Sequence, residues 1–217
     1  MPHPAHRLAG HIVFRDIKPE NLVLDQDGYA VIIDFGFAKV LQNSAKTYTL
    51  CGTPQYLAPE IVISQGHGFA ADWWAFGILL YEMTTGFPPF DDANAMGIYK
   101  QIMSNRLVYP VTVKGRAKAL IAKLLVTQPH KRLGGGKSGA QEVMEDSFFE
   151  EYNFEELQRK EYLAPWTAQQ PLESERLVPS NGSAPLSSPA ASSLFYDEAA
   201  PVSAHELARL DGEFASL

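Results

Sequence analysis

Residues 14–36 read FRDIKPENLVLDQDGYAVIIDFG. Polar residues gather at both ends of this stretch, and aliphatic residues typical of strands fill its middle. The turn signal Gln26-Asp27-Gly28 separates two such runs, residues 23–25 and 29–34, which predicts a β-hairpin. Because a hairpin brings its two ends together, we expect the polar residues before and after it to share one site.

The polar residues at the two ends are of the types that phosphoryl transfer requires. That reaction depends on positioning and charge stabilisation more than on covalent chemistry. Asp16 offers a carboxylate to an attacking hydroxyl, and Lys18 offers a cation to the transferring phosphoryl group. Asn21 and Asp34 offer an amide and a carboxylate oxygen, which are ligand types that Mg²⁺ prefers. We therefore predict one magnesium site shared by the two ends of the hairpin.

The composition is that of a globular chain. It has 217 residues, of which 46% are hydrophobic and 20% charged, and one cysteine, Cys51. These values exclude a wholly disordered, collagenous or disulfide-stapled protein, and also a cysteine-rich zinc site. The longest apolar run, residues 73–81, is far shorter than the roughly 20 residues that span a bilayer. Since the first residues contain no hydrophobic secretory core, we expect a cytoplasmic protein, with the nucleus as a second compartment, that is not secreted.

The net charge of −7 is unevenly distributed. Residues 1–150 hold 14 acidic and 14 basic residues, whereas residues 151–217 hold 11 acidic and 4 basic ones. This balance argues against nucleic-acid binding, which needs a basic surface. The basic residues of 114–123 alternate with aliphatic ones at helical spacing, which predicts an amphipathic helix over residues 114–126.

The remaining segments differ clearly in pattern. Residues 35–57 contain glycines, a proline and several hydroxyl side chains, and we expect a long, irregular, functional surface loop. Residues 72–85 are nearly all apolar and are followed by Gly86, which predicts a buried central helix. Residues 171–193 contain four Pro and seven Ser, which predicts a flexible segment. Further helices are expected near residues 94–104 and 139–146.

Four motifs follow one another in a fixed order. They are Phe14-Arg15-Asp16 with Lys18 and Asn21, then Asp34-Phe35-Gly36, then Gly52-Thr53-Pro54 with Ala58-Pro59-Glu60, and then Asp72-Trp73-Trp74. Each motif is weak alone, but the ordered set resembles the catalytic half of a protein kinase. Asp-Phe-Gly-Phe-Ala-Lys39 and Thr49-Leu-Cys-Gly-Thr53 resemble the AGC group, and within it the catalytic subunits of the cyclic-AMP-dependent kinases. The resemblance is dense over residues 12–170 and sparse beyond.

The resemblance implies a fold and its boundaries. The fold is mainly α with a small β-hairpin, the carboxyl-terminal lobe of a protein kinase (α+β), followed by an extended AGC-type tail. The implied parts are a non-matching leader at 1–11, the lobe at 12–149 and the tail at 150–217. Four stretches of this sequence resemble landmarks of that tail. They are Phe148-Phe149, Ala164-Pro165-Trp166, Phe195-Tyr196-Asp197-Glu198 and the terminal Phe214 to Leu217.

The same resemblance assigns roles in catalysis. It implies ATP-dependent phosphorylation of serine or threonine in protein substrates, with Mg²⁺ as cofactor. Asp16 is the implied catalytic base, and Lys18 and Thr53 contact the phosphate and that aspartate. The implied cofactor-binding residues for ATP are Glu20, Asn21, Val23 and Asp34, of which Asn21 and Asp34 hold the metal.

Regulation is implied at Thr49, the expected phosphorylation site of the activation loop. Arg15 and Lys39 are the cations implied to bind its phosphate, and charge-assisted hydrogen bonds of this kind order a loop. The alternative is an unmodified hydroxyl at Thr49. Cys51, in the same segment, is expected to be a structural thiol, with redox sensing as the alternative.

Other residues are implied to hold the lobe together or to bind the substrate. Glu60 and Arg132 are expected to form a buried ion pair, and Asp72 to hold the backbone of the catalytic loop. Glu20 and Glu82 are implied to receive an arginine, so the implied substrates are basic near the target residue. The alternative for Glu82 is a solvated acid at a helix end. A cyclic-nucleotide-binding regulatory subunit is a further implied partner, while neither nucleic acid nor a membrane span is expected.

The sequence also departs from the family. Phe14 stands where the family has tyrosine or histidine, and Gln55 stands where it has glutamate, which weakens a preference for distant arginines. No glycine-rich phosphate loop or strand lysine precedes Asp16, so the small lobe is expected to be missing. The run 134–138 resembles a P-loop, but Lys131 occupies the position of the required first glycine, which excludes a P-loop hydrolase.

Two hypotheses of different classes remain. In the first, the chain is the large lobe and tail of a serine/threonine kinase and has little activity alone. In the second, it is a truncated pseudokinase that docks a regulator or a substrate without turnover. A reading frame that continues upstream and encodes the glycine-rich loop favours the first, and an in-frame stop favours the second. In either case, Val23, Phe35 and Phe214 would lose the small lobe as their packing partner, which predicts poor solubility.

Overall fold

The computed structural model describes residues 12–41, 46–111 and 113–165. These residues belong to two units, each described by itself. The larger unit comprises residues 12–23 and 31–163, with the gaps just given. The described part of the smaller unit is the hairpin tip at 24–30 with residues 164 and 165. The predicted flexible segment at 171–193 and the tail landmarks from Trp166 onward lie outside the described residues.

The predicted hairpin is confirmed. Strands β2 (Leu22–Leu24) and β3 (Ala30–Ile32) pair in a two-stranded sheet. The carboxylate of Asp25 accepts the backbone N–H groups of Asp27 and Tyr29, both at 2.9 Å, which closes the turn in the way expected of an Asx motif.

A second small sheet was not expected. Strand β1 (Ile12–Val13) pairs antiparallel with β4 (Lys39–Val40). β4 lies inside residues 35–57, so the prediction that this range is irregular throughout is wrong. The same range contains an isolated antiparallel bridge between Thr47 and His67, and the 3-10 helix η2 (Pro54–Tyr56). Strands of two residues carry no alternation signal, which is why the sequence pattern did not predict them.

The four predicted helices are confirmed within two residues at each end, as α3 (Ala70–Thr85), α4 (Ala95–Ser104), α5 (Gly115–Leu124) and α6 (Ala140–Met144). Two further helices, α2 (Pro59–Val62) and α7 (Phe154–Gln158), were not predicted. Short 3-10 helices are η1 (Pro19–Asn21), η3 (Pro129–Lys131) and η4 (Ser147–Phe149). None of the described helices is long and apolar enough to cross a membrane.

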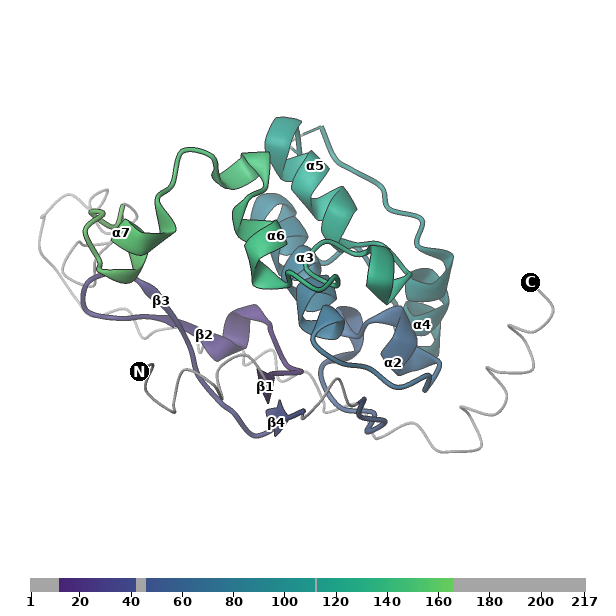
Figure 1. Ribbon diagram of the computed structural model, residues 1–217. Coiled ribbons are helices and arrows are strands. Elements are labelled where there is room, and N and C mark those ends of the chain that lie inside the picture. Colours follow the sequence, from purple (N-terminus) through teal and green to yellow (C-terminus); the bar gives the residue numbers. More distant parts are fainter. Residues whose placement is uncertain (1–11, 42–45, 112, 166–217) are drawn as a thin grey trace, which may run out of the picture. The chain divides into compact units, whose positions relative to one another are not determined.

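Helix α3 forms the centre of the larger unit, as its apolar sequence predicts. Figure 1 shows α3 among α2, α4, α5 and α6. Trp74 and Ile78 are fully buried, and the ring of Trp74 stacks on that of Phe90. The helix ends at Gly86, which adopts its left-handed φ of 86° without strain and whose N–H donates to the backbone carbonyl of Glu82 at 2.7 Å.

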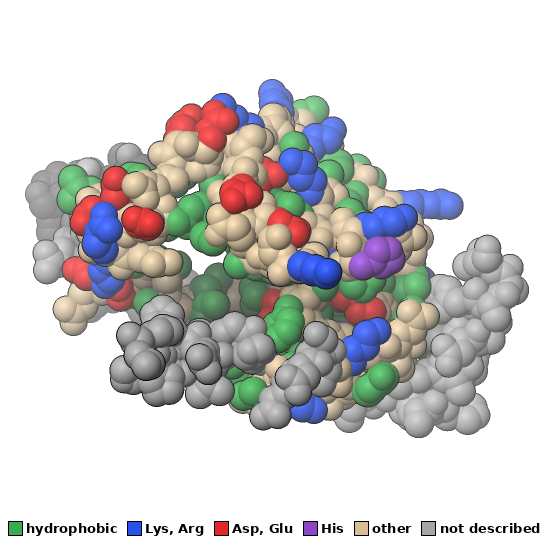
Figure 2. Space-filling view, viewed as in Figure 1, with side chains coloured by type: hydrophobic (Ala, Val, Ile, Leu, Met, Phe, Trp, Pro, Cys, Tyr) green, Lys and Arg blue, Asp and Glu red, His purple; other side chains and the backbone are tan. Residues whose placement is uncertain are grey.

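Helix α5 is amphipathic, as predicted. Leu120, Ile121 and Leu124 are buried, and α5 packs against α3. Gly77 of α3 makes this close packing possible, because a Cβ there would lie 2.8–2.9 Å from Leu125 Cδ2 and Leu124 Cβ. Figure 2 shows lysine and arginine side chains gathered over the outer face of α5. They form the solvated face of a helix, as the spacing of these residues predicts.

Candidate active site

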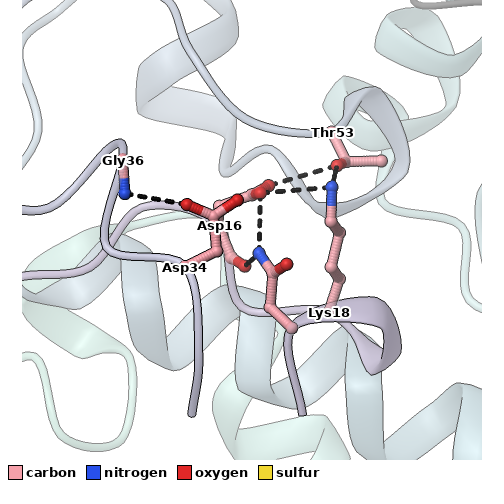
Figure 3. Close-up of polar contacts among 6 residues, drawn as sticks. Asp16, Lys18, Asp34, Gly36 and Thr53 are labelled. Atoms are coloured by element: carbon pink, nitrogen blue, oxygen red, sulfur yellow. Dashed lines mark hydrogen bonds and ion pairs between the residues drawn. The ribbon is translucent and has the colours of Figure 1, made fainter.

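The carboxylate of Asp16 lies at the centre of a polar cluster (Figure 3). Its Oδ1 accepts a hydrogen bond from the hydroxyl of Thr53 at 3.1 Å, and its Oδ2 accepts one from the amide of Asn21 at 2.8 Å. Lys18 Nζ lies 3.1 Å from Asp16 Oδ2 and donates to Thr53 Oγ1 at 2.9 Å. Two partners from the catalytic loop (residues 14–21) and one from the activation segment (residues 35–57) therefore fix the orientation of a carboxylate that is only 6% exposed.

The backbone just before Asp16 is held by Asp72 of α3. Asp72 Oδ2 accepts the N–H of Phe14, and Oδ1 accepts that of Arg15, both at 2.8 Å. These bonds hold Arg15 at a φ of 74°, which is rare for a residue with a side chain. Burial raises the pKa of Asp72 to about 6, although the two N–H groups and the charge of Arg15 act in the opposite direction. Asp72 thus has the anchoring contacts that the resemblance implied.

The activation segment approaches the catalytic loop closely at Gly52, next to Thr53. Gly52 has a φ of 111°, and a Cβ at this position would lie 2.8 Å from the carbonyl oxygen of Arg15. Only glycine fits both the backbone conformation and the space. The approach carries the Thr53 hydroxyl to Asp16.

The hairpin brings the two candidate metal ligands to one end. Ile33 N–H donates to Asn21 O at 2.9 Å, which brings the next residue, Asp34, close to Asn21. Asn21 uses its amide nitrogen to donate to both the carbonyl and the carboxylate of Asp16, at 2.8 Å each, which leaves its amide oxygen as the atom for a ligand. One oxygen of the exposed Asp34 carboxylate accepts the Gly36 N–H at 3.0 Å.

The donor chemistry of this pair fits magnesium. Amide and carboxylate oxygens suit a hard cation, and Mg²⁺ usually takes one or two protein ligands and completes its shell with phosphate and water oxygens. Among the described residues, no group of three or more His, Cys, Asp or Glu side chains offers a metal site. Asn21 and Asp34 therefore remain the candidate metal ligands of the described chain.

The other residues implied to bind nucleotide lie near this end of the hairpin. Glu20 is exposed on η1, next to Asn21 in the chain, and Val23 of β2 is 41% exposed. Phe14 is buried, and its ring packs edge-to-face on that of Phe35, with centroids 5.3 Å apart. Phe35 itself is 61% exposed, which agrees with the expectation of an apolar surface here.

Arg15 and Lys39, the two cations implied to bind a phosphate on Thr49, both donate hydrogen bonds to residues of the activation segment. Arg15 Nε donates to Phe37 O at 2.6 Å, while Lys39 Nζ donates to Thr47 Oγ1 at 3.0 Å. Thr49 itself is exposed. Burial raises the pKa of the Cys51 thiol, so this cysteine has less thiolate at neutral pH than a free one.

Glu60 and Arg132 form the ion pair that the resemblance implied. The guanidinium binds both carboxylate oxygens of Glu60, at 2.8 and 2.9 Å, and both side chains are buried. Arg132 also donates to the carbonyls of Val126 and Ala70 and lies over the ring of Trp74. The buried cation is thus fully engaged, as a buried charge requires.

Glu82 is not a freely solvated acid. Its carboxylate accepts a hydrogen bond from the hydroxyl of Tyr56, which is itself buried. Gln55, at the position of the departure from the family, donates to Asp91 at 3.4 Å. The sequence did not single out Tyr56, because a tyrosine between two short motifs looks like a packing residue.

Thr47 and His67 are two further residues that sequence reasoning missed. Both are 2% exposed, although Thr47 lies in residues 35–57, which were predicted to be a surface loop. No local pattern marks either residue, since their contact depends on the single bridge between distant segments.

The chain belongs to the protein kinase family. The family model for the protein kinase domain matches residues 5–149, which is more than half of the chain. The mostly helical fold with small antiparallel sheets and the order of the motifs agree with this assignment.

The similar proteins are kinases of the expected group. The chain is 48% identical over 154 residues to the cAMP-dependent protein kinase catalytic subunit PRKX of Homo sapiens, covering 71% of this chain and 42% of that protein. It is 48% identical over 154 residues to the cAMP-dependent protein kinase catalytic subunit 3 of Drosophila melanogaster, covering 71% and 26%. It is 41% identical over 162 residues to the cGMP-dependent protein kinase 2 of Rattus norvegicus, covering 74% and 21%. The resemblance to the cyclic-AMP-dependent group is confirmed, and the chain spans less than half the length of these relatives.

Proposed function

We propose that the chain supplies the catalytic half of a serine/threonine protein kinase. The reaction is transfer of the γ-phosphoryl group of ATP to a serine or threonine hydroxyl of a protein. The observation that supports this proposal is the polar cluster around Asp16, which joins a carboxylate, a cation and the candidate metal ligand Asn21, while the hairpin brings the second candidate ligand, Asp34, next to the residue that bonds to Asn21. Phosphoryl transfer needs this combination of positioning and charge.

Each residue of the cluster has a distinct task in this proposal. Asp16 orients the substrate hydroxyl and accepts its proton as the oxygen attacks phosphorus. Lys18, already 3.1 Å from Asp16, places a positive charge beside the transferring group. Thr53 ties the activation segment to both side chains, so that the order of this segment controls the geometry of the base. Asn21 and Asp34 would hold Mg²⁺, which neutralises phosphate charge when bound.

Two acidic residues support a proposal for the substrate class. Glu82, oriented by Tyr56, offers a fixed carboxylate, and Glu20 offers an exposed one. We propose that they receive a basic residue of the protein substrate. A cyclic-nucleotide-binding regulatory subunit and a cytoplasmic and nuclear location belong to the same proposal, since relatives of this chain are named as cAMP-dependent catalytic subunits.

The test uses phosphate transfer to an Arg-Arg-x-Ser peptide. We expect little transfer by the chain alone, because its sequence carries no glycine-rich phosphate loop. Joined to the small lobe of the human relative, the chain should transfer phosphate, and Asp16→Asn should lower that rate by about 100-fold or more while nucleotide binding stays near normal. Asp27→Asn removes an exposed carboxylate at the hairpin tip and serves as the control.

Two outcomes would contradict the proposal. Unchanged turnover in the Asp16→Asn chimera would remove Asp16 from the role of base. Normal magnesium-nucleotide binding without transfer by the wild-type chimera would favour the docking module without turnover.

A further inference from the structure

A second polar cluster lies where the activation segment meets the chain before α3. Thr47 N–H donates to His67 O at 2.9 Å, and His67 N–H donates to Thr47 O at 2.8 Å. In an antiparallel pair that exchanges both bonds, the two side chains lie on the same side. Since Lys39 Nζ donates to Thr47 Oγ1, the imidazole of His67 is on the side of this cation.

Two buried nitrogen atoms of this cluster lack partners. His67 Nε2 and Arg15 Nη1 are both buried, and the described residues offer neither of them a hydrogen-bond acceptor. An unsatisfied buried polar group costs about 1–3 kcal/mol, and more when it is charged. Such groups in a folded protein call for an explanation, and a ligand that arrives later is one.

The charges around His67 are unbalanced. Two cations, Arg15 of the catalytic loop and Lys39 of β4, interact electrostatically with the imidazole. One acid, Glu60 of α2, does so with the opposite sign. Glu60 is already bound through both oxygens by Arg132. No carboxylate of the described chain forms an ion pair with Arg15 or Lys39. Burial, then Arg15 and Lys39, lower the pKa of His67 to about 4, so the imidazole is neutral until negative charge arrives.

We propose that His67 is a hydrogen-bond donor to the phosphoryl group of Thr49, beside Arg15 and Lys39. The inference rests on the proposed role of Thr49 as the phosphorylation site. Thr49 follows Thr47 by two residues and is exposed, so a phosphoryl group on it starts from a position close in the chain to the Thr47–His67 bridge. A phosphothreonine brings a charge near −2 and three acceptor oxygens, which match the three basic side chains of the cluster.

The proposal has a consequence for protonation. The phosphate dianion favours the imidazolium form, and this form supplies the N–H that the buried Nε2 position needs. Phosphorylation and protonation of His67 therefore reinforce one another, which binds the activation segment to the loop before α3.

The direct test measures the pKa of His67 by NMR in the full chain. One sample is phosphorylated at Thr49 by an upstream kinase and checked by mass spectrometry, and the other is unmodified. We expect phosphorylation to raise the pKa of His67 by about one unit or more. The exposed His130 should not shift and serves as the internal control. An unchanged pKa of His67 would overturn the proposal.

A second measurement follows removal of the phosphate by a phosphatase. His67→Gln should speed dephosphorylation of Thr49 severalfold, whereas the matched His130→Gln variant should behave as wild type. Equal rates in all three proteins would overturn the proposal. If His67→Gln does not fold, the NMR measurement of the His67 pKa in the unsubstituted chain still tests the proposal.

A third arm distinguishes the phosphothreonine from a free anion. Inorganic phosphate is added to the unmodified chain, and the His67 signal is followed. We expect no rise in its pKa, because the proposed ligand is tethered. An equal rise with inorganic phosphate would assign the cluster to a free anion and overturn the assignment to Thr49. None of these arms needs kinase activity from the chain, so their failure is distinguishable from failure of the proposed function.

Discussion

At the scale of single residues, Asp72 combines two opposing effects. Its carboxylate accepts two backbone N–H groups of the catalytic loop, yet its burial favours the neutral form. Its pKa is about 6 in the folded protein against 3.8 for an ordinary aspartate. Because the folded state binds this proton more tightly, the group stabilises the fold below about pH 4, and this contribution is lost as the pH rises through about 6.

The substitution Asp72→Asn should remove this pH dependence. Relative to the variant, the wild type should gain on the order of 2–3 kcal/mol of unfolding free energy between pH 7.5 and pH 4, at about 1.4 kcal/mol per pKa unit. Urea unfolding of both proteins at several pH values measures the difference. The opposing titration of His67 is present in both proteins and largely cancels. Parallel stability curves would show that Asp72 titrates normally.

The site residues that the sequence predicted were those whose partners lie nearby in the chain or in an ordered motif. Asp16, Asn21 and Asp34 flank one hairpin, so its geometry alone brings them together. His67 and Tyr56 could not be predicted in this way, because their contacts join segments that no local pattern connects. A buried histidine and a buried tyrosine look like ordinary packing until their polar atoms are located.

At the scale of elements, the contact of α3 with α5 depends on Gly77. Gly77→Ala should gain up to about 1 kcal/mol of helix propensity. It should lose more, about 1–3 kcal/mol, because the new Cβ meets the Cβ of Leu124 as well as the end of Leu125. Thermal or urea unfolding should therefore show a net loss of about 1–2 kcal/mol. Thr84→Ala, at an exposed position of the same helix, should stay within about 0.5 kcal/mol. A Gly77→Ala protein as stable as wild type would mean that the two helices separate easily.

The long elements were predictable, and the short ones were not. Helix α3 has a continuous apolar sequence and a glycine at its end, and α5 has helical spacing of its buried residues. The pairing of β1 with β4 instead depends on chain closure around the catalytic loop, which two-residue strands do not encode by pattern.

At the scale of the whole molecule, the larger unit exposes apolar side chains on its strands and on the segment between β3 and β4. They are Ile12, Val23, Val31, Ile32, Ile33, Phe35, Phe37 and Val40, each at least 39% exposed. Exposed apolar side chains in such number favour association. We expect the chain to self-associate as its concentration rises, as measured by sedimentation velocity.

Charged substitutions test the origin of this association. Ile32→Lys with Val40→Lys should weaken it severalfold. Val111→Lys, at an apolar position that is 83% exposed elsewhere in the same unit, should have little effect. A chain that remains monomeric at every concentration would contradict the expectation, and so would equal effects of the two sets of substitutions.

The most direct test of the account is binding of Mn²⁺, a spectroscopic substitute for Mg²⁺, together with ADP, followed by electron paramagnetic resonance. Wild type and Asp27→Asn should bind the metal–nucleotide complex alike, since Asp27 lies at the hairpin tip. Asp34→Asn and Asn21→Ala should bind it at least about tenfold more weakly, because the first loses the negative charge of a carboxylate ligand and the second loses an amide oxygen ligand. Wild-type affinity in the Asp34→Asn protein would contradict the account.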